Sequence, residues 1–151
     1  MSTTVRTATL GDLDSLAVLF DAYRQFYEQP PDLGRARRFL EERLQLGESV
    51  VFIALGADGS AQGFTQLYPS FSSVRAARTW LLNDLFVAPD ARRQGVAESL
   101  LGAAAAFARA RGAARMTLAT TVDNTAAQAL YERLGWRREE GFLEYALQLP
   151  A

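Results

Sequence analysis

The segment from Val87 to Ala97 has the residue types of an anion-binding turn. A β-prone stretch ends at Val87, and a helix-prone stretch begins at Gly95 after a proline turn. The first N–H groups of a helix lack acceptors within the helix, and the helix dipole makes that end partly positive. Glycine and alanine leave these amides open to phosphate oxygens, while Arg92 and Arg93 add positive charge. The spacing R-x-x-G-x-A therefore indicates a phosphate site, with a plain strand-to-helix turn as the alternative.

A second group of chemically useful side chains lies further along, in the helix-prone segment that starts at Asn124. Asn124, Ala127 and Tyr131 are spaced i, i+3 and i+7, which places them on or near one face of a helix. A tyrosine is protonated at neutral pH, because its reference pKa is about 10, and it can serve as a general acid. The three residues could line one side of a cleft. The alternative is a helix cap at Asn124 and a half-buried core tyrosine.

The residue types that are missing from the sequence exclude several kinds of catalytic and metal site. The 151 residues include no cysteine and no histidine, and all 16 basic residues are arginines. These absences exclude disulfides, Cys/His zinc sites, a cysteine nucleophile, a Ser-His-Asp triad and a Schiff-base lysine. We expect no metal. An enzyme of this composition must work with carboxylates, tyrosines, hydroxyls, arginines and backbone dipoles.

Charge and hydropathy bear on the compartment and on partners. The formal net charge of −1 argues against a dedicated nucleic-acid-binding protein, which usually has a basic excess. The most apolar uncharged stretch, residues 99–108, is alanine-rich and well short of the roughly 20 residues that cross a membrane. The first six residues contain no apolar run of signal-peptide type. We therefore expect a cytoplasmic protein that binds neither nucleic acid nor membrane.

The elements that must position these residues follow from the apolar periodicity and the turn formers. The first half is predicted to hold a strand at 5–9, helices after Asp12 and Asp32, and strands 50–55 and 63–68 joined through Asp58-Gly59. The second half is predicted as strand 80–87, helix 95–111, strand 116–121, helix 124–134 and strand 142–149. The chain is predicted to form a single α/β domain over residues 1–151.

Taken together, the two motifs resemble the GNAT superfamily of acyl-CoA-dependent N-acetyltransferases. The resemblance rests on R-x-x-G-x-A after the strand text Asp84-Leu85-Phe86-Val87, followed by N-x-x-A-x-x-x-Y-x-x-x-G-W. It covers residues 80–136 closely, and the first half is similar in the order of its segments. It implies a GNAT-like α/β (α+β) fold, with a mixed, mostly antiparallel central sheet of about six to seven strands flanked by about four helices.

The resemblance also implies acetyl-CoA as co-substrate. Main-chain groups at the end of the fourth strand would pair with the pantetheine arm, and amides at the start of the next helix would bind the pyrophosphate. Tyr131 matches the tyrosine commonly proposed to protonate the departing thiolate. The implied cofactor-binding residues are Leu85, Phe86, Val87, Arg92, Arg93, Gln94, Gly95, Val96, Ala97, Glu98, Asn124, Ala127 and Tyr131.

The base and the acceptor site are less defined. Several relatives carry a glutamate where this chain has Asn83, so the candidates are Asp84, another carboxylate acting through water, or bulk solvent. A structural role for Asp84, bonded to backbone or arginine, is an equal alternative. Strand alternation predicts that Asn83 and Asp84 point to opposite faces. The candidate substrate-binding residues are Tyr27, Trp80 and Asn83, with core or dimer contacts as the alternative for the aromatic ones.

The predicted function is transfer of an acetyl group from acetyl-CoA directly to a primary amine of a small molecule. The strand text from Leu82 to Val87 is similar to small-amine acetyltransferases, and a protein N-terminus or lysine is the alternative acceptor. A non-catalytic acyl-CoA sensor or interaction domain, and a protein that binds another phosphorylated ligand at the Gly95 turn, are alternatives of other classes. The aromatic residues also allow a homodimer.

Overall fold

A computed structural model describes residues 3–150, which divide into two compact units, one extending to Ala119 and one starting at Thr120. The first unit contains a five-stranded sheet in the order β1-β2-β3-β4-β5. Its neighbouring strands are antiparallel except for β4 and β5, which are parallel. The elements of this unit are β1 (Thr4–Thr7), α1 (Leu13–Phe26), α2 (Leu33–Gln45), β2 (Val50–Leu55), β3 (Ala61–Ser72), β4 (Ala77–Val87), α3 (Val96–Ala110) and β5 (Arg115–Thr117).

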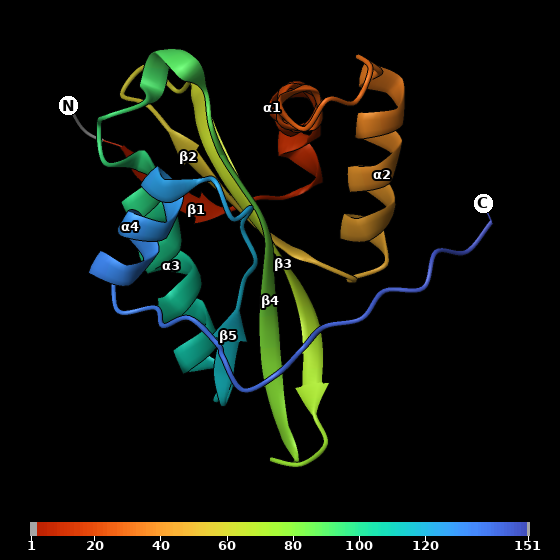
Figure 1. Ribbon diagram of the computed structural model, residues 1–151. Coiled ribbons are helices and arrows are strands. Elements are labelled where there is room, and N and C mark those ends of the chain that lie inside the picture. Colours follow the sequence, from red (N-terminus) through yellow and green to blue (C-terminus); the bar gives the residue numbers. More distant parts are fainter. Residues whose placement is uncertain (1–2, 151) are drawn as a thin grey trace. The chain divides into compact units, whose positions relative to one another are not determined.

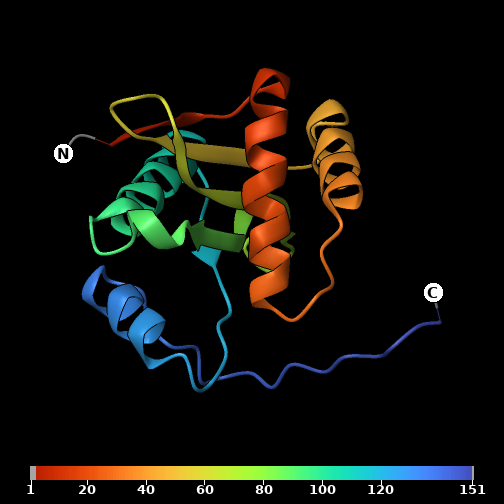
Figure 2. The same ribbon diagram turned by 90° about the horizontal axis from the view of Figure 1, so that it is seen from above.

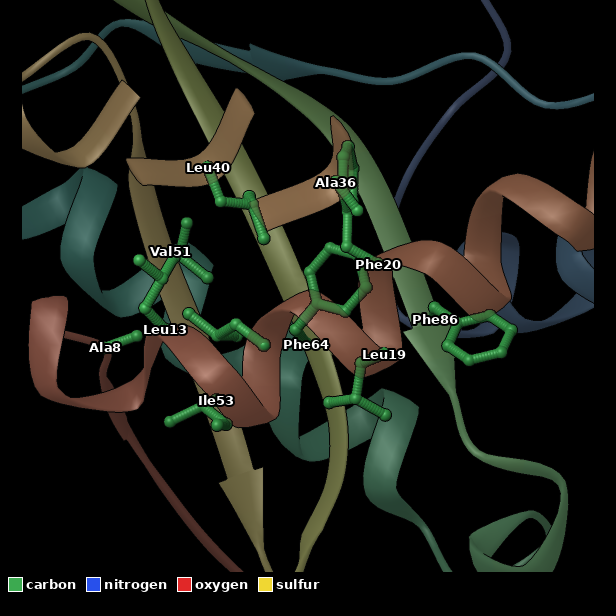
Figure 3. Close-up of a cluster of buried hydrophobic side chains, with 11 residues drawn as sticks. Ala8, Leu13, Leu19, Phe20, Ala36, Leu40, Val51, Ile53, Phe64 and Phe86 are labelled. Carbon is green, nitrogen blue, oxygen red and sulfur yellow. The ribbon is translucent and has the colours of Figure 1, made fainter. Parts of the chain in front are cut away.

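Helices α1 and α2 cover one face of the sheet and α3 covers the other (Figures 1 and 2). Residues from α1, α2 and the facing sides of β2, β3 and β4 form a buried apolar cluster that includes Phe20, Leu40 and Phe64 (Figure 3). On the opposite face, Phe107 of α3 packs edge-on against Phe52. Burial of apolar surface on both faces of the sheet stabilises this three-layer arrangement.

Local sequence explains where the α1–α2 connection bends and where α2 begins. The double proline at 30–31 lies between the two helices, where proline cannot supply a helical N–H. Asp32 caps α2, because its side chain accepts a hydrogen bond from the Arg35 amide at 3.0 Å. Asp12 was expected to cap α1, but its carboxylate instead binds Arg6 at 2.8 Å and the Thr9 amide at 2.8 Å. The Asp12 carboxylate is therefore occupied by Arg6 and by the Thr9 amide, and it does not cap α1.

The second unit contains helix α4 (Thr125–Arg133) followed by an extended segment. The prediction of a strand at 142–149 is wrong for the described residues, so the sheet has five strands rather than six to seven. A β-strand requires hydrogen bonds to a neighbouring strand. Among the described residues of this unit, α4 is the only regular element, so the unit supplies no such neighbour. Residues 142–150 keep the alternating pattern but lie exposed. The four predicted helices and the mixed, mostly antiparallel sheet are confirmed.

Candidate active site

Strand β4 loses its partner on one side over its last six residues. It pairs with β3 as far as Val87, but it pairs with β5 only at Thr79, Trp80 and Leu81. Within residues 3–150, positions 82–87 therefore have no neighbouring strand on the β5 side. This open edge contains the three residues expected to pair with an extended ligand, Leu85, Phe86 and Val87. The Val87 carbonyl oxygen accepts a hydrogen bond from Arg92 Nε at 3.0 Å.

The end of β4 lies unusually close to β3 at Gly63. A Cβ added to Gly63 would lie 2.6 Å from the carbonyl oxygen of Phe86 and 3.3 Å from Val87 Cα. Both atoms belong to backbone, so no side-chain rotation would relieve the contact. Only glycine fits here, and it fixes the position of the strand end that borders the open edge.

The turn after β4 presents the start of α3 to solvent. Gly95 is the N-cap residue with φ of 78°, and no side chain caps this end of the helix. Arg93 also has a positive φ, 64°, which is uncommon for a residue with a Cβ. The side chains at 92–94 are exposed, and space around the Gly95 Cα is open to 4 Å. An uncapped helix start with an open glycine fits a pyrophosphate, because its amides need acceptors.

The two arginines of this turn differ in direction. Arg92 folds back over β4, where its guanidinium lies 5.6 Å from the centre of the Phe86 ring and bonds the Val87 carbonyl. Arg93 is exposed and no ion pair in the described residues includes it. Gln94 bonds back to the Asp90 carbonyl at 3.4 Å. Of these side chains, Arg93 is therefore the one available to an anion bound at the helix start.

A β-bulge in β4 places a carboxylate under α1. Gln66 of β3 pairs with Asp84, but the next residue, Leu67, pairs with Leu82, so Asn83 is an extra residue in the ladder. The expectation that Asn83 and Asp84 point to opposite faces is wrong, because Asn83 Nδ2 donates to Asp84 Oδ1 at 3.0 Å. The bulge interrupts the strand alternation on which that expectation depended.

Asp84 is only 4% exposed, and neutral groups donate hydrogen bonds to it. Gln66 Nε2 donates to Asp84 Oδ2 at 2.8 Å, Asn83 donates to the other oxygen, and the Tyr23 hydroxyl also bonds the carboxylate. Burial raises the pKa of Asp84, while these hydrogen bonds oppose the rise. These partners are neutral side chains, and both a structural and a catalytic role for Asp84 are compatible with them. A carboxylate of this kind takes up a proton more readily than an exposed one.

Aromatic rings lead from this carboxylate to the surface along α1. Tyr23 packs edge-on against Tyr27 with ring centres 5.2 Å apart, and Tyr27 packs against Phe26 at the same distance. Tyr27 is 45% exposed and Phe26 is 60% exposed. On β3, burial is the first cause that raises the pKa of the Tyr68 hydroxyl to about 12, and the charge of Asp84 is the second.

Trp80, a candidate substrate-binding residue, does not lie on the α1 side of the sheet with Asp84. It is buried on the α3 side, where its ring centre lies 5.2 Å from that of Phe107. Sequence reasoning missed Gln66 and Tyr68, although one signal was available. Gln66 is a long polar residue in the mostly apolar stretch Gly63 to Tyr68, and a polar residue that is buried in a strand needs a partner.

The second unit carries the other motif on α4. Asn124 caps the helix, since its Oδ1 accepts a hydrogen bond from the Ala127 amide at 3.2 Å. Tyr131 is half-buried and its ring centre lies 6.2 Å from that of Trp136. The Trp136 amide bonds the Tyr131 carbonyl at 3.0 Å, which closes the helix around Gly135 with φ of 99°. This C-terminal cap brings the tryptophan against the tyrosine.

Comparison with known proteins decides the family. The model of the Acetyltransferase (GNAT) family matches residues 16–136. The chain belongs to the GNAT acetyltransferase family. It is 46% identical to YhfO of Bacillus subtilis, an uncharacterized N-acetyltransferase, over 97% of this chain and 98% of that protein. It is 31% identical to an aminoglycoside N(6')-acetyltransferase type 1 of Salmonella typhimurium over 70% of this chain and 74% of that protein.

A crystal structure of a probable acetyltransferase has a TM-score of 0.93 to this GNAT chain at 46% identity, covering 98% of this chain and 99% of that one. The chain is an acetyl-CoA-dependent N-acetyltransferase. Among residues 3–150, no helix combines the length and apolar character needed to cross a membrane. The same residues bring together no group of three or more side chains that could hold a metal ion.

Proposed function

We propose that this GNAT enzyme transfers the acetyl group of acetyl-CoA directly to a primary amine of a small molecule, with Asp84 as proton acceptor and Tyr131 as general acid. The observation that carries the proposal is the environment of Asp84. A buried carboxylate with neutral donors lies at the bulge from which β4 continues without a partner strand toward β5. Buried carboxylates with raised pKa values are typical of groups that exchange protons in enzymes.

The chemistry requires removal of protons from the amine, delivery of a proton to the leaving thiolate, and no enzyme nucleophile. An alkylamine has a pKa of about 10.4 by analogy with lysine, so at neutral pH it must lose a proton before its nitrogen attacks the thioester. In the proposal Asp84 receives that proton. Attack forms the carbon–nitrogen bond and leaves the nitrogen with one proton more than an amide carries. The tetrahedral intermediate then collapses, the carbon–sulfur bond breaks, and Tyr131 donates its hydroxyl proton to the thiolate of CoA. The extra proton on nitrogen leaves through water and restores the Tyr131 hydroxyl. An N–H of Phe86 or Val87 is proposed to stabilise the oxyanion, a contribution of about 3 kcal/mol in comparable sites.

The proposed acetyl-CoA contacts use the residues that fit each part of the molecule. Main-chain groups of Leu85, Phe86 and Val87 at the open edge of β4 would pair with the amide-bearing pantetheine arm, as a strand would. Amides from Arg93 to Glu98 would bind the pyrophosphate, with the Arg93 guanidinium adding charge and Arg92 holding the end of β4. Asn124 and Ala127 complete the proposed set on α4.

The acceptor is proposed to be a small molecule for two reasons. A relative that is 31% identical is named as an aminoglycoside acetyltransferase, which acts on amines of small molecules. Exposed aromatic rings on α1 also suit an amine, because a cation is attracted to a ring face and a carbon chain packs on it. Tyr27 and Asn83 are the proposed acceptor contacts. The single domain and the homodimer stay predictions, and light scattering at several concentrations tests the second.

The test is release of CoA, measured with a thiol reagent, across a panel of amines. The panel should include alkylamines, polyamines, amino acids, aminoglycosides and a peptide with a free N-terminus. We expect turnover with at least one small amine, and loss of most of kcat in Asp84→Asn with unchanged activity in Glu42→Gln, a control carboxylate exposed on α2. Acetyl-CoA should raise the melting temperature, since ligand at 100 times its Kd stabilises by about 2.7 kcal/mol. Stabilisation without CoA release from any amine would contradict the catalytic proposal and favour a sensor.

A further inference from the structure

The carboxylate of Asp84 has side-chain partners on three different elements. Gln66 comes from β3, Asn83 from β4 and Tyr23 from α1. Gln66 is fully buried and Asp84 is nearly so, whereas Asn83 is exposed. Thr65, the neighbour of Gln66, donates from its hydroxyl to the Asp84 carbonyl oxygen at 2.8 Å, which fixes the backbone of the same residue. These contacts hold the Asp84 carboxylate in one orientation.

In the buried amide of Gln66, the nitrogen has a hydrogen-bond partner among the described residues and the oxygen has none. Its nitrogen donates to Asp84, while its oxygen Oε1 is buried and has no partner within residues 3–150. An unpartnered buried oxygen costs stability, so its persistence needs a reason. A carboxamide is planar, and a half-turn exchanges its donor and its acceptor. Gln66 can therefore donate to an ionised Asp84 or, after that turn, accept from a protonated one.

We propose that Gln66 and Tyr23 are positioning residues for acetyl transfer, holding the Asp84 carboxylate as proton acceptor, and that the Gln66 amide reverses when Asp84 is protonated. This inference rests on the proposed function of Asp84. In the step, an N–H bond of the acceptor ammonium breaks and an O–H bond forms on Asp84, while the electron pair stays on the amine nitrogen. Gln66 Oε1 then accepts the hydrogen bond from the new O–H. No electron leaves or enters the site.

The other titratable and charged groups around Asp84 set the expected pH behaviour. The Tyr27 ring packs against Tyr23 on α1, and Tyr68 faces the carboxylate from β3. Arg43 of α2 acts on Tyr68 and lowers its pKa, opposing burial. Tyr68 is neutral in the range where a carboxyl titrates, because its pKa is raised. Hydrogen bonds to an ionised group are roughly twice as strong as neutral ones, so losing a donor favours protonated Asp84.

The test compares Tyr23→Phe and Gln66→Met with a matched control, Tyr68→Phe, which removes a nearby hydroxyl that has no recorded hydrogen bond to Asp84. The readouts are the acid limb of the kcat/KM profile and the titration of the Asp84 carboxyl carbon by NMR, which suits a chain of 16.6 kDa. In both test variants the limb and the NMR midpoint should move upward together by about one pH unit, and in Tyr68→Phe neither should move.

Each outcome decides one point. The positioning role is overturned if the acid limb of the kcat/KM profile does not move in either test variant, or if it moves equally in Tyr68→Phe. It is also overturned if the pH of the acid limb does not match the NMR midpoint of Asp84. If Gln66→Met does not fold, Tyr23→Phe decides alone, because phenylalanine keeps the ring. If the wild-type enzyme acetylates no amine, the proposed function fails. The NMR midpoint then tests the hydrogen-bonded cluster separately, and an unmoved midpoint in Tyr23→Phe would overturn that as well.

Discussion

The substitution Gly63→Ala tests whether the contact between β3 and β4 sets the geometry of the cofactor edge. The added Cβ would lie 2.6 Å from the Phe86 carbonyl oxygen, about 0.8 Å closer than the 3.4 Å at which ordinary contact begins. The obstacle is backbone, so β4 itself must move. Overpacking of this kind costs about 1–3 kcal/mol. For a chain of this size that corresponds to a fall in Tm of roughly 3 to 9 °C.

Scanning fluorimetry measures the Tm, and initial rates at varied acetyl-CoA measure KM. Because the strand end would shift away from β3, we expect the KM for acetyl-CoA to rise along with the loss of stability. Gly102→Ala is the matched control, since nothing lies within 4 Å of the added Cβ and the residue is exposed on α3. Alanine in an exposed helix should stabilise the protein by about 0.5–1 kcal/mol. A Gly63→Ala protein with the Tm and KM of the wild type would refute the reasoning.

Three further outcomes are expected. Tyr131→Phe should lower kcat by at least about tenfold with little change in Tm, since general acids contribute about 10²–10⁴-fold; unchanged turnover across the pH range would remove Tyr131 from the mechanism. Gly95→Glu should abolish stabilisation by acetyl-CoA, because it places a carboxylate and a strained positive φ at the helix start, and a retained thermal shift would show that the pyrophosphate binds elsewhere. Arg6 lowers the pKa of Asp12 from 3.8 to about 2, so the ionised carboxylate contributes stability that is present above pH 4 and lost as pH falls toward 2. Urea unfolding should show the difference between wild type and Asp12→Asn shrinking over that range, and a constant difference would show that the pair does not act through its charge.

Most regular elements could be predicted because their signals are local. The apolar run Val50–Leu55 is β2 with the predicted bounds, and the cap at Asp32 starts α2 as predicted. Gly95 is the N-cap of α3, at the residue where the sequence predicted that the helix begins. Each of these depends on a few neighbouring residues.

The features that could not be predicted depend on pairing between distant segments. Leu82, Asp84 and Phe86 alternate regularly in the sequence, so nothing local shows that Asn83 is an extra residue opposite Gln66. The same applies to residues 142–149, whose alternation is suited to a strand but whose hydrogen bonds depend on an available edge. Burial of Gln66 against Asp84 likewise follows from the register of β3 with β4.

The bulge at Asn83 divides β4 into two stretches, and residues at positions of the same parity in the two stretches pack against different helical layers. Trp80 packs against Phe107 of α3, whereas Asp84 and Phe86, at positions of the same parity, contact Tyr23 of α1. One inserted residue thus lets a continuous strand change sides without a break in its ladder with β3. Substitutions at positions 80 and 82 would be limited by core packing. Substitutions at positions 84 and 86 would be limited by the proposed catalytic and cofactor-binding roles. Deletion of Asn83 would remove the bulge and make Leu82 and Asp84 adjacent, with their pairing to Leu67 and Gln66 unchanged, so both layers would keep their residues and only the Asn83 amide would be lost.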